Sequence, residues 1–222
     1  MNDLTLIIPA KYEKESLPKV LDELKKFDVK KNIVLEKSDK LTVEAISNYD
    51  CKIIYQDSVG YGDALKKGIQ TTETEFFCIF NADGSFNPDE LNAMISKIKK
   101  DKYDFVFATR YEKNCGSDDD TIVTYVGNYI FTLLGKIFFK LGITDILYTF
   151  VMGRTSFAKK LELTAKDFSF CVELPIKAKR ANYKICTSKS YERSRIAGKK
   201  KVNAFKDGLK ILFSMIKLFF RY

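Results

Sequence analysis

The stretch Glu75-Phe76-Phe77-Cys78-Ile79-Phe80-Asn81-Ala82-Asp83-Gly84 decides how this chain is expected to fold. Residues 76–80 form a short apolar run, which is typical of a buried strand, and the polar residues that follow end that strand. Ligands of parallel α/β sheets bind at the carboxyl ends of the strands, so the Asp83 carboxylate is placed to reach a divalent cation on a diphosphate. The alternative is a plain β-turn, which uses Asn, Asp and Gly for their backbone tolerance.

The residues on both sides of this stretch alternate between strand and helix patterns. Apolar runs predict strands at 4–8, 32–35, 52–55, 75–80 and 104–108, and the segments between them predict helices at 16–27, 42–48, 63–71 and 88–100. Ser16, directly before Leu17 and Pro18, is the expected N-cap of the first helix. This order predicts an α/β fold, with a mainly parallel, Rossmann-like sheet and helices on both faces.

The pattern changes after residue 110. Residues 112–121 are polar, contain the run Asp118-Asp119-Asp120, and are expected to form a mobile loop. The apolar periodicity then predicts helices at 126–141, at 173–180 and from 202 to the end, with a strand at 183–186. Residues 188–201 form a basic loop between that strand and the last helix.

The composition limits the chemistry of the chain. Its 222 residues, 45% hydrophobic and 30% charged, suit one sizeable α/β domain. Because the sequence has no histidine, carboxylates must supply any acid–base or metal chemistry. Five cysteines without a CxxC pair indicate a reducing compartment, and the apolar run at 4–8 is too short for a signal peptide. The net charge of +9 predicts an anionic partner.

Two further segments follow predicted strands. The segment Pro9-Ala10-Lys11-Tyr12-Glu13 offers the carboxylate of Glu13 to a ribose or base, although it also fits a solvated loop. The segment Gly60-Tyr61-Gly62 lets backbone N–H groups approach an anion at the start of the next helix. Neither the dinucleotide GxGxxG spacing nor a P-loop is present, so those families are not supported.

Taken in order, these motifs resemble glycosyltransferase family 2, which has the GT-A fold, and in particular its dolichol-phosphate mannose synthase-like branch of polyprenyl-phosphate glycosyltransferases. The resemblance covers nearly the whole chain and rests on five short motifs in order. The first three are Pro9, Ala10 and Glu13; Gly60, Gly62, Ala64 and Leu65; and Asn81-Ala82-Asp83-Gly84, followed by Pro88 and Glu90. The last two are Thr109-Arg110-Tyr111, and Arg195-Ile196-Ala197-Gly198 with Lys199-Lys200-Lys201, followed by Asp207-Gly208. It implies a GT-A domain at 1–200, with a nucleotide-sugar-binding half at 1–111 and an acceptor-side half at 112–200, followed by an amphipathic helix at 201–222.

The resemblance also implies roles for single residues. A GDP- or UDP-sugar donor would be bound by Pro9, Ala10, Tyr12, Glu13, Glu36, Gly60, Gly62, Lys67, Asn81, Ala82 and Asp83. Asp83, helped by Asn81 and Ser85, would hold Mg²⁺ or Mn²⁺ on the diphosphate. The donor and acceptor phosphates would be surrounded by Arg110, Arg193, Arg195, Lys199 and Lys201. Guanidinium forks bind phosphate bidentately and lysines add point charge, which agrees with this division.

Several positions depart from the family pattern. Asn81 replaces the first acid of the metal motif, so the cation has one carboxylate fewer. Glu36-Lys37-Ser38 stands where the family has Asp-Asp-Gly-Ser, and Thr149-Phe150-Val151 replaces the ending of Ser-Gly-Phe-Arg. A weakened metal requirement and a catalytically inactive nucleotide-sugar-binding protein are therefore alternatives.

The acceptor is a second open choice. A polyprenyl phosphate is already anionic and needs positioning and charge stabilisation, which Asp83 and Arg110 can provide. A saccharide hydroxyl in cell-surface polysaccharide synthesis would need a carboxylate base, and then Asp145 or Glu173 is the candidate. Nucleic acid is not expected, because no nucleic-acid-binding motif is present.

The last helix predicts contact with a membrane. Lysines and an arginine recur along one stripe, and Phe205, Leu209, Leu212, Ile216 and Phe219 form the opposite one. A buried core helix is the alternative, but this pattern favours an interfacial helix on anionic lipid, with 126–141 as its neighbour. We expect a peripheral enzyme on the cytoplasmic face of the membrane, and a separate membrane-anchoring partner or a homo-oligomer is left open.

Overall fold

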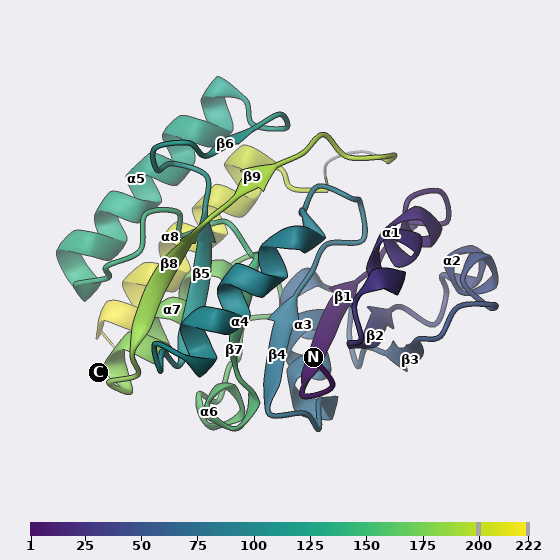
Figure 1. Ribbon diagram of the computed structural model, residues 1–222. Helices are drawn as coiled ribbons and strands as arrows, with labels where there is room; N and C mark the ends of the chain where they lie inside the picture. Colours follow the sequence, from purple (N-terminus) through teal and green to yellow (C-terminus); the bar gives the residue numbers. More distant parts are fainter. Residues whose placement is uncertain (199–200, 221–222) are drawn as a thin grey trace.

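The computed structural model describes residues 1–198 and 201–220 and contains a seven-stranded sheet in the order β3-β2-β1-β4-β7-β5-β8 (Figure 1). The neighbouring strands pair in parallel, except that β7 runs antiparallel to both β4 and β5. A second, two-stranded sheet joins β6 and β9. The elements in chain order are β1 (Leu4–Pro9), α1 (Leu17–Glu23), η1 (Leu24–Lys26), β2 (Lys30–Leu35), α2 (Lys40–Ala45), β3 (Lys52–Tyr55), α3 (Tyr61–Thr71), β4 (Phe76–Ile79), η2 (Pro88–Glu90), α4 (Leu91–Lys99), β5 (Phe105–Thr109), β6 (Gly116–Ser117), α5 (Ile122–Phe139), β7 (Val151–Arg154), α6 (Thr155–Lys160), α7 (Phe170–Arg180), β8 (Ile185–Lys189), β9 (Tyr191–Glu192) and α8 (Ala204–Phe220).

Helices cover both faces of the sheet, as the βα alternation predicts. Successive side chains of a strand point to opposite faces, so Leu6 and Ile8 of β1 pack into the cluster that contains α1 and α4. Ile7 packs on the other face, in the cluster that contains α3 and α7. A Cβ at Gly68 of α3 would collide with Ile7, so this glycine lets α3 lie close to the sheet. The expected α/β architecture is confirmed.

Two parts of the chain differ from the expectation. The sequence analysis did not predict β7 and α6, and β7 enters the sheet between β4 and β5. Residues 112–121, expected to be a mobile loop, include β6, which pairs with β9 through Gly116 and Tyr191. The Asp118 N–H also donates to the Glu192 carbonyl at 2.9 Å, which ties this loop to the basic segment. The loop is therefore ordered by a partner about seventy residues further along the chain.

The last helix packs against α5 and α7. Its inward stripe consists of Ile211, Met215 and Leu218, which are buried. Phe219 contacts Phe138 of α5, with ring centroids 5.6 Å apart. Phe205 and Leu209, which belong to the apolar stripe predicted from the sequence, face outward on another side of the helix. The helix thus presents an inner apolar face, an outer apolar face and a basic edge.

Candidate active site

A cavity of about 680 Å³ lies at the carboxyl ends of five strands that run in the same direction. Its walls include residues that directly follow β1, β2, β3, β4 and β5, which is where parallel sheets bind ligands. The predicted site residues that line it are Pro9, Ala10, Tyr12, Glu13, Glu36, Gly60, Asn81, Ala82, Asp83, Arg110, Arg195 and Lys201. The strands therefore bring together most of the residues that the sequence motifs singled out.

The turn after β1 fixes the carboxylate of Glu13. Tyr12 has a positive φ of 56°, and its N–H donates to the Asp39 carboxylate at 2.6 Å. The Ser16 hydroxyl donates to Glu13 Oε2 at 2.6 Å, and Glu13 is only 7% exposed. Ser16 is the N-cap residue of α1, as predicted, but its hydroxyl holds Glu13 and makes no capping hydrogen bond.

The glycines before α3 allow two segments to approach closely. Gly60 has φ of 140°, and a Cβ there would collide with the Lys166 carbonyl. A Cβ at Gly62 would lie 2.6 Å from the Ala165 carbonyl oxygen, so Gly62 packs behind the cavity and does not line it. Lys67 also lies outside the lining, where its Nζ is 2.8 Å from Asp57 Oδ1. Of the three, only Gly60 is placed to contact a donor.

The turn after β4 orients Asp83. The Ser85 N–H and hydroxyl donate to Asp83 Oδ1 at 3.0 and 2.7 Å. Asp83 Oδ2 lies 3.8 Å from Arg195 Nη1, on the cavity side. The Asn81 amide nitrogen lies 3.4 Å from the Ser85 hydroxyl, so the amide oxygen keeps its acceptor capacity. Ser85 is 1% exposed and acts by holding Asp83, not by lining the cavity.

This donor set fits a metal ion only in part. Within residues 1–198 and 201–220, no group of three acidic or cysteine side chains could hold a metal ion alone. Mg²⁺ is commonly bound by one or two carboxylates together with substrate phosphates and waters. Asp83 and the amide oxygen of Asn81 can supply the protein share of such a site. The residues therefore fit a metal held jointly with a diphosphate, and they do not fit one held by the protein alone.

The basic segment places two of its predicted cations in the cavity. Arg195 Nη2 lies 2.8 Å from Asp119 Oδ2, and Lys201 forms an ion pair with Glu13. Burial alone would lower the pKa of Arg195, but the neighbouring Asp119 and Asp83 carboxylates raise it above its ordinary value, so it stays charged. Arg193 does not line the cavity, and Lys199 lies outside the residues that the structure describes.

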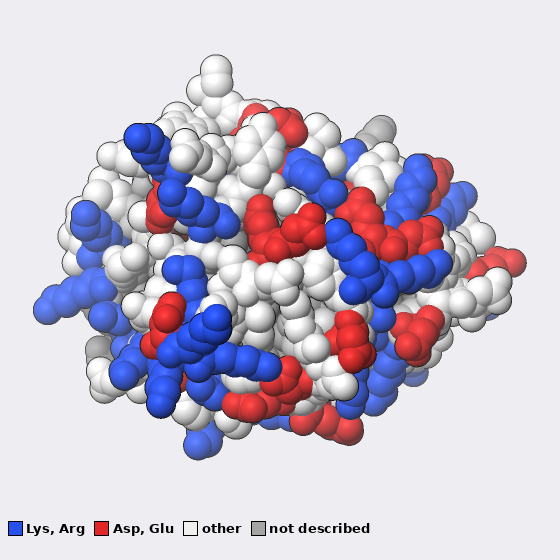
Figure 2. Space-filling model, viewed as in Figure 1, with Lys and Arg blue, Asp and Glu red and all other residues white. Residues whose placement is uncertain are grey.

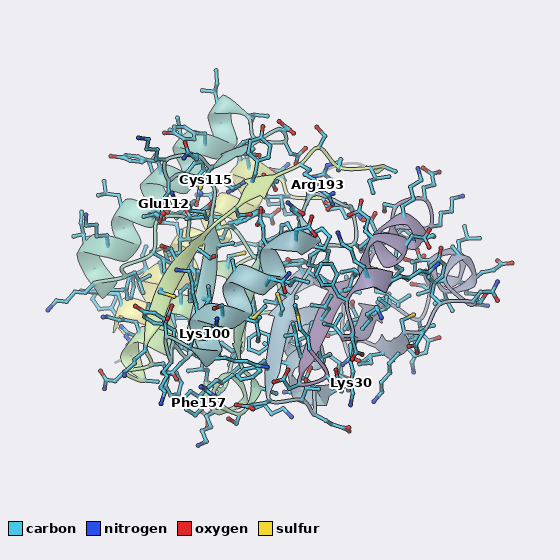
Figure 3. The ribbon with its side chains drawn as sticks, viewed as in Figure 1. Lys30, Lys100, Glu112, Cys115, Phe157 and Arg193 are labelled. Carbon is cyan, nitrogen blue, oxygen red and sulfur yellow. The ribbon has the colours of Figure 1, made fainter. Side chains whose placement is uncertain are left out.

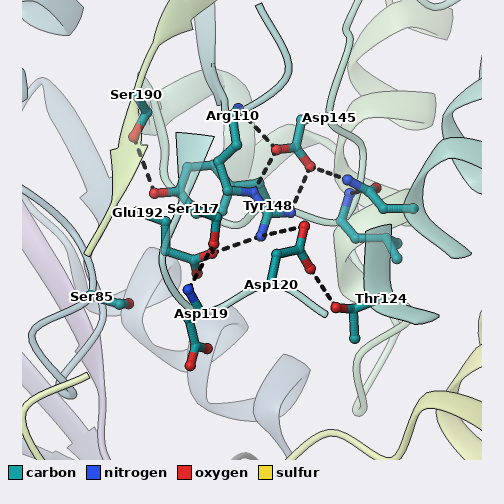
Figure 4. Close-up of polar contacts among 12 residues, drawn as sticks. Ser85, Arg110, Ser117, Asp119, Asp120, Thr124, Asp145, Tyr148, Ser190 and Glu192 are labelled. Atoms are coloured by element: carbon teal, nitrogen blue, oxygen red, sulfur yellow. Dashed lines mark hydrogen bonds and ion pairs between the residues drawn. The ribbon is translucent and has the colours of Figure 1, made fainter. Parts of the chain in front are cut away.

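Arg110 is the centre of a buried ion cluster (Figure 4). Its Nε and Nη2 donate to Asp145 at 2.8 and 3.0 Å, and its Nη1 donates to Glu192 at 2.8 Å. The guanidinium carbon also lies 4.5 Å from the ring centroid of Tyr148. Burial would lower the pKa of Arg110, but the two carboxylates raise it well above its ordinary value. All three nitrogens are thus held by protein carboxylates, which leaves little capacity for a phosphate.

Neither carboxylate proposed as a base lines the cavity. Asp145 is 1% exposed and accepts from Arg110 and Asn128. Glu173 accepts from the Thr164 and Ala165 backbone N–H groups at 2.8–3.0 Å, which anchors the segment that packs on Gly62. The geometry gives neither group access to an acceptor, so their catalytic role has no structural support.

The cavity also contains residues that the sequence reasoning did not assign. Asp119 and Asp120 come from the polar loop after β5, and Glu192 comes from β9. Asp120 accepts hydrogen bonds from the Tyr111 and Thr124 hydroxyls. The only signal in the sequence was the acidic run itself, directly before an apolar helix. Its partners lie on other segments, and the local pattern does not reveal them.

Comparison with known proteins identifies the family. The model of glycosyl transferase family 2 matches residues 5–162, which is well over half of the chain. Uncharacterized glycosyltransferases of Mycobacterium tuberculosis and Mycobacterium bovis are 25% identical to the chain over 97 residues. This match covers 44% of the chain and 44% of each relative, so the chain matches less than half the length of these relatives.

Solved structures show the same fold. Glucosyl-3-phosphoglycerate synthase from Mycobacterium tuberculosis, in complex with Mn²⁺, UDP and glucosyl-3-phosphoglycerate, superposes with a TM-score of 0.78 at 13% identity, covering 97% of this chain and 79% of that one. Its complex with Mn²⁺, UDP and phosphoglyceric acid gives 0.77 at 12% identity, covering 98% and 78%. The shared architecture is the GT-A α/β fold. Fold, family match and the grouping of the motif residues agree: the chain belongs to glycosyltransferase family 2.

Proposed function

We propose that this enzyme transfers a sugar from a nucleotide-sugar to a polyprenyl phosphate at a membrane surface, with Mg²⁺ or Mn²⁺ on the donor diphosphate. One observation carries the proposal: a single cavity reaches from the Asp83 turn to the helices that expose apolar surface. Thr124 and Asn128 of α5 and Ile211 of α8 line the same cavity as Asp83. A phosphate at the Asp83 end and an apolar chain along the helices would suit these two environments.

Charge and the fold neighbours support the donor half. Those neighbours bind UDP together with Mn²⁺ or Mg²⁺. Here Asp83 and Asn81 would hold the cation, which would neutralise charge on the departing diphosphate. Arg195 and Lys201 would add positive charge from the other side of the cavity. When substrate binds, Arg195 would exchange its present partner Asp119 for phosphate oxygens, and Lys201 would exchange Glu13 in the same way.

A phosphorylated acceptor fits the position of Asp145 and Glu173, the two predicted bases, which lie outside the cavity lining. The similar glucosyl-3-phosphoglycerate synthase was solved with phosphoglyceric acid, which is a phosphorylated acceptor. An anionic phosphate oxygen attacks without losing a proton, so catalysis requires position and charge stabilisation. The buried, paired state of Asp145 and Glu173 is compatible with this chemistry. A saccharide hydroxyl would require a free carboxylate near the sugar.

The outer surfaces of α5 and α8 support a lipid acceptor. Ile122, Tyr129 and Phe138 of α5 are 84%, 61% and 52% exposed, and Phe205 and Phe213 of α8 are 84% and 66% exposed. Large exposed apolar patches are rare on monomeric soluble proteins and mark protein or membrane contacts. The edge of the molecule at the upper end of α5 is largely uncharged (Figure 2). Within the described part of the chain, α5 alone is long and apolar enough to cross a membrane, and only 17% of it is buried.

Lysines border this surface and favour an anionic leaflet. Lys206, Lys210 and Lys217 are exposed on α8, next to its outward phenylalanines. Basic residues beside an apolar helix face are typical of helices that lie in the interface of anionic membranes. We therefore propose a peripheral location on the cytoplasmic face, which the unpaired cysteines also favour.

The donor and acceptor halves can be tested separately. Calorimetry with UDP- and GDP-sugars, with and without Mn²⁺, measures donor binding, and we expect binding that Mn²⁺ strengthens. Transfer is then measured in vesicles that contain polyprenyl phosphate or, as the matched control, polyprenol. We expect product only from the phosphate. Equal transfer to polyprenol or to a saccharide would show that the acceptor group is a hydroxyl and not the lipid phosphate.

A further inference from the structure

Arg193 lies outside the cavity but bonds to the turn that carries Asp83. Its Nη2 donates to the Gly84 and Phe86 carbonyls at 2.9 and 2.8 Å. The same nitrogen lies 2.8 Å from Glu23 Oε2, at the end of α1. Figure 3 shows Arg193 just beyond β9, on the side toward α1. The side chain therefore joins three segments. Its Nη2 already donates to protein oxygens and has no hydrogen left for a phosphate.

The backbone around Arg193 follows the same turn. The Arg193 N–H donates to the Ser85 carbonyl at 2.8 Å, and the Ile196 N–H donates to the Asp83 carbonyl at 2.7 Å. Gly84 has φ of 83°, and a Cβ there would collide with the Ile196 side chain. Residues 193–196 and 83–86 are thus aligned by two backbone hydrogen bonds, and we call this alignment their register. Arg193 adds side-chain hydrogen bonds between the same two segments.

This register determines the spacing between the two charged groups that face the cavity. Arg195 Nη1 lies 3.8 Å from Asp83 Oδ2, and both residues lie within the paired segments. Ser85 occupies Asp83 Oδ1, so Oδ2 is the oxygen that faces both Arg195 and the cavity. A shift between the two segments would change the distance between carboxylate and guanidinium.

We propose that Arg193 is a positioning residue, which holds Arg195 beside Asp83 so that both groups face the same bound diphosphate from the wall of the cavity. The inference rests on the donor half of the proposed function and does not depend on the acceptor. It differs from the expectation that Arg193 binds phosphate itself. Lysine is not an adequate replacement, because it lacks the second nitrogen, Nη1, which lies 3.4 Å from Glu23 Oε1, and the rigid plane that aims Nη2 at the two carbonyls.

The expected effect follows from the role. Residues that orient a binding group typically change affinity or activity by about 10- to 100-fold when they are replaced. Arg193→Ala and Arg193→Lys should both weaken binding of a nucleoside diphosphate in the presence of Mn²⁺ by roughly tenfold or more, on the same scale. Glu23→Gln is the matched control, because it weakens one contact and keeps both carbonyl bonds, and it should change affinity less than about twofold.

A double-mutant cycle with Arg195→Ala distinguishes positioning from direct binding or general destabilisation. If Arg193 acts through Arg195, Arg193→Lys should cost less than about twofold once Arg195 is alanine, because effects of coupled residues do not add. The affinities are measured by calorimetry with UDP or GDP and Mn²⁺, and circular dichroism checks the fold of each variant. An equal loss in both backgrounds, or no loss in either, would overturn the inference. A wild-type chain that binds no nucleoside diphosphate would instead refute the proposed function, a result that this cycle reports separately.

Discussion

Replacing Arg110 by alanine should destabilise the protein strongly. The side chain of Arg110 is 10% exposed, that of Asp145 is fully buried and that of Glu192 is 11% exposed. Removing one partner of a buried ion pair leaves an uncompensated buried charge and costs about 3–5 kcal/mol. Domains of this size lose roughly 2–4 °C per kcal/mol, so the melting temperature of Arg110→Ala should fall by about 6–20 °C.

The assay is a double-mutant cycle read by urea and thermal unfolding. Asp145→Asn removes one of the two carboxylate charges that Arg110→Ala leaves without its partner, so the double variant should be less destabilised than the sum of the single variants, by about 2 kcal/mol. Lys26→Ala is the control, because the Lys26–Asp89 pair is more than half exposed on both sides, and it should cost less than about 1 kcal/mol.

A different result would refute this reasoning. If Arg110→Ala abolishes sugar transfer while its unfolding free energy stays within about 0.5 kcal/mol of wild type, the guanidinium is not a structural hub. It would then bind phosphate directly, as the sequence resemblance implied, and the ion cluster would rearrange when substrate enters.

Three further predictions concern other parts of the molecule. Asp83→Asn should reduce transfer by about 100-fold or more, with little change in melting temperature, because it removes the one acidic metal ligand; unchanged kinetics across a Mn²⁺ titration would contradict the role given to this carboxylate. Burial alone would raise the pKa of Glu173, but hydrogen bonds from Lys177 and from two backbone N–H groups lower it below its ordinary value of about 4.5. Its stabilising contribution is therefore complete above that pH and is lost as the pH falls through the lower folded pKa. Glu173→Gln should therefore flatten the acid limb of a curve of unfolding free energy against pH. A variant curve parallel to that of the wild type would show that Glu173 does not contribute to this pH dependence. Replacing Phe205 and Phe213 by serine should release the protein from anionic vesicles in a flotation assay without changing its melting temperature by more than a few degrees, because both rings are exposed; unchanged flotation would remove α8 from the proposed membrane contact.

The sequence predicted the part of the site that follows from strand order. Asp83, Glu13 and Arg110 each come directly after a strand or within a few residues of one, and the parallel sheet brings those ends together. This required only the alternation of apolar runs and helices. The antiparallel β7 was missed because its four residues are short and a non-local pairing, not a local pattern, determines their place.

The roles of single charged residues could not be predicted in the same way. Arg193 and Arg195 are two positions apart in one basic segment, yet one bonds to backbone carbonyls and the other faces the cavity. Glu173 likewise appeared available as a base, but two backbone N–H groups and Lys177 hold it. Such differences depend on which acceptors the folded chain places nearby. A resemblance in sequence gives the type of site, and tertiary contacts decide which of its charges are free to act.

The most direct test of the central claim is the mass of the product lipid. The purified chain is incubated with Mn²⁺, polyprenyl phosphate in anionic vesicles and a panel of UDP- and GDP-sugars, one at a time, and the extracted lipid is analysed by mass spectrometry. We predict that one donor adds a single sugar residue to the lipid phosphate, and that polyprenol stays unmodified. An unmodified lipid phosphate with every donor, alongside sugar transfer to a saccharide or to a small phosphorylated acid, would contradict the account.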